Sequence, residues 1–217
     1  AASIVFSEHA IVVEYNNNHY LLFQVYDKRR DSLIEASIRT FCYIHHEFAG
    51  RQFPYSRALK LLHPDSEDGN VLLSCAPTLV IHRLTSSSPI VAAAALAGFS
   101  WSNTNGCNVT QLKEALYKLA HLEVLVEVNG IESITTAQVQ ARWSFLVTEI
   151  DFDVCDGQCE TSDVSIHNGR AQIHRTSVAQ WRNASNGIEV PPASGQLACA
   201  LAFHVPELQE DSRWRND

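Results

Sequence analysis

The sequence predicts a mainly β fold: an immunoglobulin-like antiparallel β-sandwich with two or three short helices at its periphery. Three observations indicate this class. Apolar runs of strand length follow one another along most of the 217 residues, turn-forming residues separate them at close intervals, and helical spacing of apolar residues is confined to short segments. No internal repeat or low-complexity linker divides the chain. We therefore expect one domain over residues 1–190 and a C-terminal extension over residues 191–217, folded as a helix or present as a tail.

The N-terminal segments predict a β-hairpin. Residues 4–6 and 10–14 are brief apolar runs, and residues 19–26 read as a returning strand. Between them lie three consecutive asparagines, which tolerate left-handed backbone angles and so favour a turn.

The next segment, residues 32–46, predicts one long strand whose side chains alternate between two faces. One face carries Leu33, Glu35, Ser37, Arg39 and Phe41, and the other carries Ile34, Ala36, Ile38, Thr40 and Cys42. The second face is the less polar one, so we expect it to face the core.

The remaining elements are further short strands and two helices. Strands are predicted over residues 55–62, 71–74, 78–84, 122–128, 138–147 and 149–154, and a hairpin over residues 163–167 and 171–174. Asn168-Gly169 is a strong turn signal for that hairpin. A short helix is expected from Pro89, because residues 85–88 offer N-cap side chains and proline suits the first helical position. A second helix is expected over residues 110–120, where Leu112, Leu116 and Leu119 have helical spacing.

The composition excludes several classes of function. The net charge of −8 and the pI of about 5.6 argue against a nucleic-acid partner, because phosphate contacts need clustered lysine and arginine. An acidic surface instead fits solubility, or a field that concentrates cations. The longest membrane-span candidate, residues 90–99, is half the roughly 20 apolar residues that a spanning helix needs. Because the chain begins at Ala1 and contains no methionine, we interpret it as a processed or excised piece.

The cysteines do not form a disulfide framework. Six are widely scattered, which is typical of reduced thiols. Cys155 and Cys159 flank a glycine-containing turn, and three interpretations remain open for them: two free thiols, a local disulfide, or a zinc site with His167 or His174.

We find no enzyme motif, and we predict no catalysis, no cofactor and no metal centre. The chain has no glycine-rich phosphate loop, no His-Glu-x-x-His segment and no serine nucleophile between glycines. His45 and His46 are adjacent at a strand end, where successive side chains point to opposite faces, so they cannot easily share a metal.

Four segments in a fixed order carry a family resemblance. They are VFSEHAIV at residues 5–12, LIEASIR at 33–39, VIHRLTSSSPI at 80–90 and VEVNGIESITTAQVQAR at 126–142. With this order and spacing, residues 3–190 resemble the cytoplasmic C-terminal domain of inward rectifier potassium channels, in bacteria as well as animals. The resemblance implies a domain that assembles as a four-fold ring below the membrane pore and extends the ion path into the cytoplasm.

The resemblance also implies which residues line that path. Glu35 matches a pore-facing acid of the family, Glu132 sits beside the loop that narrows the cytoplasmic entrance, and Asp65, Glu67 and Asp68 fall in a turn where the family places further pore acids. The loop that narrows the path corresponds to Ile131, Glu132, Ser133, Ile134, Thr135 and Thr136. Such acids attract potassium and bind magnesium and polyamines. From the residues alone, the 65–70 turn reads as a solvated loop, whereas Glu35 shares a strand face with Leu33 and Phe41, where a charge is unusual unless that face lines water.

Two further expectations concern partners. Lys28, Arg29 and Arg30 match a basic corner that helps the family sense anionic lipid, but the family's main lipid-binding bases precede the domain and only residues 1–3 precede the first strand here. A solvated turn is therefore the preferred interpretation. We expect a tetramer at the cytoplasmic face of a membrane. The alternative is a free-standing descendant of the domain that serves as a structural subunit of a larger complex, such as an organellar one.

Overall fold

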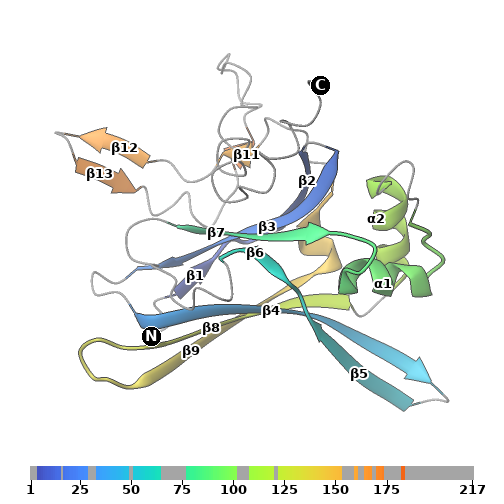
Figure 1. Cartoon of the computed structure of the whole chain (residues 1–217), viewed down its shortest axis with the longest axis horizontal. Coiled ribbons are helices and arrows are strands. Elements are labelled where there is room, and N and C mark those ends of the chain that lie inside the picture. Colours follow the sequence, from blue (N-terminus) through green and yellow to red (C-terminus); the bar gives the residue numbers. More distant parts are fainter. Residues whose placement is uncertain are drawn as a thin grey trace, which may run out of the picture.

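Two sheets packed face to face make up most of the described chain, which confirms the predicted β-sandwich (Figure 1). The structure is a computed structural model and describes residues 4–15, 17–28, 33–48, 51–64, 77–101, 108–119, 122–152, 159–160, 164–167, 170–173 and 182–183. The predictions for the C-terminal extension, for the strand at 71–74 and for the thiols of Cys155 and Cys159 lie outside the described residues and side chains.

The larger sheet has six strands. Their order is β10 (Ile150–Asp151), β2 (Ala10–Tyr15), β3 (Asn18–Asp27), β7 (Thr78–Leu84) and β6 (Leu61–His63), and β1 (Ile4–Phe6) also pairs with β3. All of these pairs are antiparallel except β10 with β2, which is parallel. The N-terminal hairpin is thus confirmed as β2 and β3.

The smaller sheet has four antiparallel strands. Their order is β5 (Arg51–Ala58), β4 (Ile34–Phe48), β8 (Leu122–Ile131) and β9 (Gln138–Leu146). Two short antiparallel pairs stand apart from both sheets: β11 (Cys159–Glu160) with β14 (Arg182–Asn183), and β12 (Val164–His167) with β13 (Arg170–Ile173). The β12–β13 pair confirms the hairpin predicted there.

The core lies between the two sheets. Every second residue of β8 is buried, which is the alternation of a strand with one dry face. Phe23 of the six-stranded sheet meets Phe145 of the four-stranded sheet with ring centroids 5.3 Å apart, and Phe6 stacks on Trp143 at 6.0 Å. These contacts join the two sheets, because aromatic rings attract one another in preferred orientations and also bury apolar area.

The opposite face of the six-stranded sheet is also buried. In β3 every residue from His19 to Asp27 is buried, so this strand has no solvent-facing side. Tyr20, Leu22 and Ile81 have no exposed surface although they lie outside the main core cluster. In Figure 1, β11 and the β12–β13 pair lie on this side of the sandwich. The six-stranded sheet is therefore covered on both faces, whereas in a simple two-sheet sandwich one face of each sheet is open to solvent.

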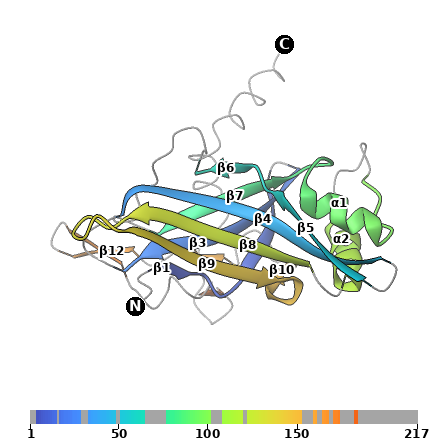
Figure 2. The ribbon, with the colours of Figure 1, turned by 90° about the horizontal axis from the view of Figure 1, so that it is seen from below.

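The two predicted helices lie together at one end of the sandwich (Figures 1 and 2). Helix α1 (Pro89–Leu96) begins at the predicted proline, and α2 (Val109–Lys118) begins after Asn108, whose side chain accepts a hydrogen bond from the Gln111 amide at 3.0 Å. Leu112 and Leu116 are fully buried, as their spacing predicts.

The strand predicted over residues 55–62 is wrong as a single element. The structure divides it into β5 and β6, which belong to different sheets. Between them Leu59 is buried, and its amide donates to the Thr40 carbonyl at 2.8 Å. The chain crosses there from one sheet to the other, a change that no glycine or turn pair in this stretch signals. The strand predicted at residues 149–154 is likewise shorter, because a 3₁₀ turn, Val147–Glu149, precedes the two-residue β10.

Candidate functional site

Glu35 and Glu132, the two acids carried over from the family resemblance, lie at the same end of the four-stranded sheet. Ile34 of β4 pairs with Ile131 of β8, and Glu35 and Glu132 are the residues that directly follow them. The β8–β9 turn marks this end, and it lies at the opposite end of the sandwich from the two helices (Figures 1 and 2). We call residues 34–36 and 131–137 the acidic end.

A β-bulge shapes β4 at this point. Ile34 pairs with Ile131 and Ser37 pairs with Asn129, so Glu35 and Ala36 together oppose the single residue Gly130. An extra residue of this kind bends the strand and re-aims the side chains around it.

The bulge corrects the predicted alternation of faces. From Ala36 to Cys42 the core face is the predicted one, but at the start of the strand the two faces are exchanged. Leu33 is buried and Ile34 is 48% exposed, the reverse of the prediction. The physical reason is the inserted residue, which shifts a period of two by one position.

Glu35 sits in the left-handed region of backbone space, with φ at 53°. For a residue with a Cβ this conformation costs on the order of 1 kcal/mol or more, and glycine is the usual occupant. The side chain is exposed. A charged, flexible residue therefore occupies the one bulge position where the backbone would favour glycine.

Gly130 allows β4 to approach β8 closely at the bulge. A Cβ at this position would lie 3.0 Å from the Leu33 Cβ and 3.1 Å from its Cδ1. These distances are shorter than carbon atoms normally adopt. The acidic end thus depends on the absence of a side chain at residue 130.

The β8–β9 turn is held by its own hydrogen bonds. The Glu132 amide donates to the Ala137 carbonyl at 2.9 Å, and the Thr136 amide donates to the Glu132 carbonyl at 2.8 Å. The Thr135 hydroxyl donates to the Glu132 carboxylate, and the Ala137 amide donates to the Thr135 hydroxyl oxygen. Thr136 has a positive φ of 55°. This network fixes the backbone of the loop that the resemblance identifies as a constriction.

Ile134 stands at the tip of this turn and is 76% exposed. Ser133, Thr135 and Thr136 are also exposed, whereas Ile131 and Glu132 are half-buried. A single exposed apolar side chain of this kind is normal on a protein surface.

The solvent-facing side of the same sheet carries paired polar groups. Arg142 and Glu127 form an ion pair at 3.0 Å, and the Gln140 amide donates to the Asn129 side chain at 2.7 Å. Both are cross-strand neighbours of β8 and β9. The Glu127 charge is therefore neutralised locally by Arg142.

Several predicted site residues are not placed. Asp65, Glu67, Asp68, Arg29 and Arg30 lie outside the described residues, and Lys28 is exposed at the end of β3. Among the described helices, none is long and apolar enough to cross a membrane.

His82 has no role predicted from the sequence, yet its side chain connects three elements. Its Nδ1 lies 2.7 Å from the Lys60 carbonyl and its Nε2 lies 2.7 Å from the Ser88 hydroxyl. A carbonyl only accepts, so Nδ1 carries the proton and Ser88 donates to Nε2. Ser88 therefore does not cap helix α1 with its side chain, although it occupies the N-cap position. Burial lowers the pKa of His82, and the hydrogen bond to Lys60 opposes that shift.

Comparison with known proteins shows which family and which relatives the chain is similar to. Residues 4–97 match the family described as the inward rectifier potassium channel C-terminal domain. The human G protein-activated inward rectifier potassium channel 3 is 26% identical over an alignment that covers 97% of this chain and 49% of the relative. The mouse G protein-activated inward rectifier potassium channel 2 is also 26% identical, over 100% of this chain and 48% of the relative. The chain thus spans about half the length of the curated relatives it matches.

The match, the relatives and the sandwich agree with the resemblance that four sequence segments indicated. Residues 4–97 are thus similar to the inward rectifier potassium channel C-terminal domain, and the relatives support that similarity over the length of the chain.

Proposed function

We propose that this chain is a cytoplasmic regulatory and pore-extending domain of an inward rectifier potassium channel, and that Glu35 and Glu132 face its cation path. Four copies would form a ring in which each acid is repeated four times. Such rings attract potassium and bind magnesium or polyamines. The domain contributes no catalysis in this proposal.

The observation that carries the proposal is the backbone of Glu35. Its φ of 53° lies where glycine is favoured, and an exposed carboxylate gains nothing for the fold there. Residues in such conformations concentrate at functional sites. The neighbouring turn supports the same conclusion, because its hydrogen bonds hold Glu132 beside the bulge.

The proposal is tested by titrating spermine into the full chain in low-salt buffer, with calorimetry as the readout and light scattering to measure the assembly. The variant is Glu35→Gln with Glu132→Gln. We expect a tetramer that binds spermine, and a loss in affinity of about threefold to tenfold in the double variant, because each exposed charge contributes up to roughly 1 kcal/mol. The loss should shrink at high salt.

The matched control is Glu114→Gln. Glu114 is exposed on α2, at the other end of the molecule, and its replacement removes one negative charge, as each single replacement at the acidic end does. Equal spermine affinity in the wild type, the double variant and the control would contradict the assignment of both acids. A strict monomer at high concentration would favour the alternative of a structural subunit in another complex.

A further inference from the structure

A polar turn of residues 85–88 connects strand β7 to helix α1 and forms part of a cavity wall. The Ser88 amide donates to the Thr85 carbonyl at 2.9 Å and closes the turn. The cavity has a volume of about 610 Å³ and lies between this turn, the β5–β6 crossover and β7. Thr85, Ser87 and Ser88 line it, whereas Ser86 is not among its lining residues. The proposed channel function gives this turn no role.

The four hydroxyl-bearing residues of the turn differ in their access to solvent. Ser88 is 3% exposed and its hydroxyl donates to His82, so it is closed to a second reactant. Thr85 is half-buried, and Ser86 and Ser87 are exposed. The Ser87 hydroxyl lies 3.0 Å from the Thr85 hydroxyl, at the wall of the cavity. Ser87 is therefore the one exposed residue of the turn that also borders the cavity.

The side chains around the cavity make it basic. Arg57, Lys60 and Arg83 line it, and none of the described residues that line it is an aspartate or a glutamate. This is unusual in a chain with a net charge of −8. Within the described part of the chain, none of the three cations forms an ion pair with a carboxylate. The cavity thus offers positive charge without a negative charge to balance it.

Arg83 has a buried donor that lacks an acceptor. Its Nη2 donates to the Asn18 side chain at 2.6 Å, but its Nε is buried and has no hydrogen-bond partner among the described residues. A buried charged donor without an acceptor is costly. An anionic group attached to Ser87 would bring acceptor oxygens to the same cavity, because both residues line it.

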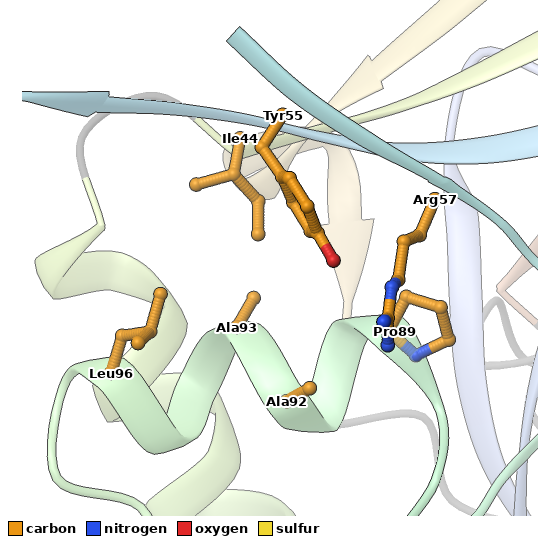
Figure 3. Close-up of a pocket in the computed structure, with 7 residues that line it drawn as sticks. All are labelled: Ile44, Tyr55, Arg57, Pro89, Ala92, Ala93 and Leu96. Atoms are coloured by element: carbon orange, nitrogen blue, oxygen red, sulfur yellow. The ribbon is translucent and has the colours of Figure 1, made fainter. Parts of the chain in front are cut away.

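The start of helix α1 lacks a side-chain cap. Ser88 occupies the N-cap position but makes no capping hydrogen bond, because its hydroxyl donates to His82. The first turn of α1 also contains no acidic residue. A negative group just before a helix is favoured by the helix dipole. Figure 3 shows the Arg57 guanidinium beside Pro89, the first residue of α1, so a cation lies next to the helix start.

From these observations we infer that Ser87 is a phosphorylation site whose phosphate binds in the basic cavity of the same chain. A serine kinase would transfer the γ-phosphoryl group of ATP to Ser87. The bond between the Ser87 Oγ and the γ-phosphorus forms, the bond from that phosphorus to its bridging oxygen breaks, ADP leaves and the hydroxyl proton is released. The phosphate carries a charge of about −1.5 to −2 at pH 7 and three acceptor oxygens. It would bind Arg57, Lys60 and Arg83 through charge-assisted hydrogen bonds.

The modification would join two parts of the fold. Arg57 lies near the end of β5 and Lys60 lies in the β5–β6 crossover, whereas Ser87 precedes α1. A phosphate bound by both cations would therefore hold the start of α1 against the crossover. This inference goes beyond the proposed cation path and does not depend on it, because the acidic end lies at the opposite end of the molecule (Figure 1).

The first experiment introduces phosphoserine at position 87 of the full chain with an expanded genetic code. Phosphoserine at position 86 is the matched control. We expect the midpoint of thermal unfolding to rise by about 3–6 °C with the phosphate on Ser87, because at least one charge-assisted hydrogen bond is gained. The same charge on Ser86 should change the midpoint by less than about 2 °C. The rise should shrink at high salt.

Two variants identify the groups that receive the phosphate. Arg57→Gln with Lys60→Gln, both at exposed positions, removes two of the three cations. In this variant, phosphoserine at position 87 should raise the midpoint by less than about 2 °C. Lys118→Gln on α2 is the charge control and should keep the full rise. Each phosphorylated protein is compared with its own unphosphorylated form, which cancels any effect of the substitutions on folding.

The ring of His82 reports whether the phosphate enters the cavity, because His82 lines it. A nearby dianion favours the protonated ring, so the phosphate on Ser87 should raise the pKa of His82. An NMR titration of the ring measures this change. A phosphate on Ser86 should leave the pKa of His82 where it is in the unmodified chain.

The second experiment asks whether the turn is a kinase substrate. The full chain is incubated with ATP and a panel of serine kinases, and tandem mass spectrometry locates the phosphate. Phosphate on Ser87 that is absent from the Ser87→Ala variant would support the inference. It is overturned if no kinase of the panel modifies Ser87, if Ser86 alone is modified, or if phosphoserine at position 87 stabilises the chain no more than phosphoserine at position 86.

Discussion

Glu35 combines three properties that rarely occur together: a negative charge, exposure to solvent and a left-handed backbone at a β-bulge. The backbone strain lies in the folded state and is offset by the rest of the sheet. A residue that costs the fold energy and returns no packing is best explained by what its carboxylate does outside the domain.

Replacing Glu35 with glycine should therefore not destabilise the domain. We expect the free energy of unfolding to stay the same or rise by up to about 1 kcal/mol, because relief of the left-handed strain offsets the added entropy of the unfolded chain. Ser37→Gly, two residues along the same strand and outside the bulge, should lower it by roughly 0.5–1 kcal/mol. Urea unfolding of the two variants measures the difference, and equal losses would show that Glu35 is not strained.

At this scale the sequence predicted a role for Glu35 because a charge stood on an expected strand face beside Leu33 and Phe41, but the bulge separates Glu35 from Leu33, which is buried while Glu35 is exposed. It gave no role to His82, whose partners lie 22 and 6 residues away. A histidine within an apolar strand is a weak signal, and only the fold brings the Lys60 carbonyl and the Ser88 hydroxyl to its ring. Pairings of this kind do not follow a sequence period.

Among the elements, the β8–β9 hairpin depends on Gly130, which lies opposite the bulge in β4. In an ordinary strand, a glycine-to-alanine change raises the free energy of unfolding, because alanine restricts the unfolded chain. Gly130→Ala should instead lower the free energy of unfolding by about 1–3 kcal/mol, because the new Cβ would lie only 3.0 Å from the Leu33 Cβ.

Chemical unfolding of Gly130→Ala and of the wild type measures the change in the free energy of unfolding, and a decrease supports the close approach of β4 to β8. Ser133→Ala in the exposed turn is the control and should change stability by less than about 0.5 kcal/mol. A stabilised Gly130→Ala variant would mean that β4 does not approach β8 as closely as the structure has it.

Elements with a strong local signal were predictable. The proline at the start of α1 and the leucine spacing in α2 each predict their element, because one side chain or one period decides it. The division of β5 from β6 and the bulge at Glu35 were not predictable. Both result from how the strands pair with distant partners, and pairing overrides local preference.

For the molecule as a whole, His82 connects β7 to the β5–β6 crossover and to the start of α1. Its pKa is lowered by burial, and the pKa of His19 is lowered for the same reason, against the attraction of Glu14. In the unfolded chain both rings take up protons near pH 6.5. Over the window below that value the unfolded state binds more protons than the folded state, so stability is lost as the pH falls.

We therefore expect the free energy of unfolding to decrease from pH 7 towards pH 5, and the decrease to be smaller in His82→Gln. The glutamine offers an amide donor for the Lys60 carbonyl and has no proton to gain. Urea unfolding at intervals across this range tests the prediction. If the two proteins have parallel pH profiles, His82 does not titrate as its burial implies.

The class of fold was predictable at this scale, whereas the second buried face of the six-stranded sheet was not. Residues such as Tyr20, Leu22 and Ile81 are apolar, but a continuous apolar run does not reveal which segment covers it. The family match also ends at residue 97, although the core is completed by Val124, Val126 and Phe145 from later strands. The folding unit is longer than the segment that the family description covers.

The parallel pair of β10 with β2 places Ile150 beside Ala10, at the edge of the six-stranded sheet. The last strand of the two-sheet core therefore lies beside one of its first strands. A module with this property can be inserted into a host polypeptide through two neighbouring connections, or have its chain order circularly permuted, without pulling either sheet apart. This geometry suits a domain that evolution can attach to different partners while its interior stays unchanged.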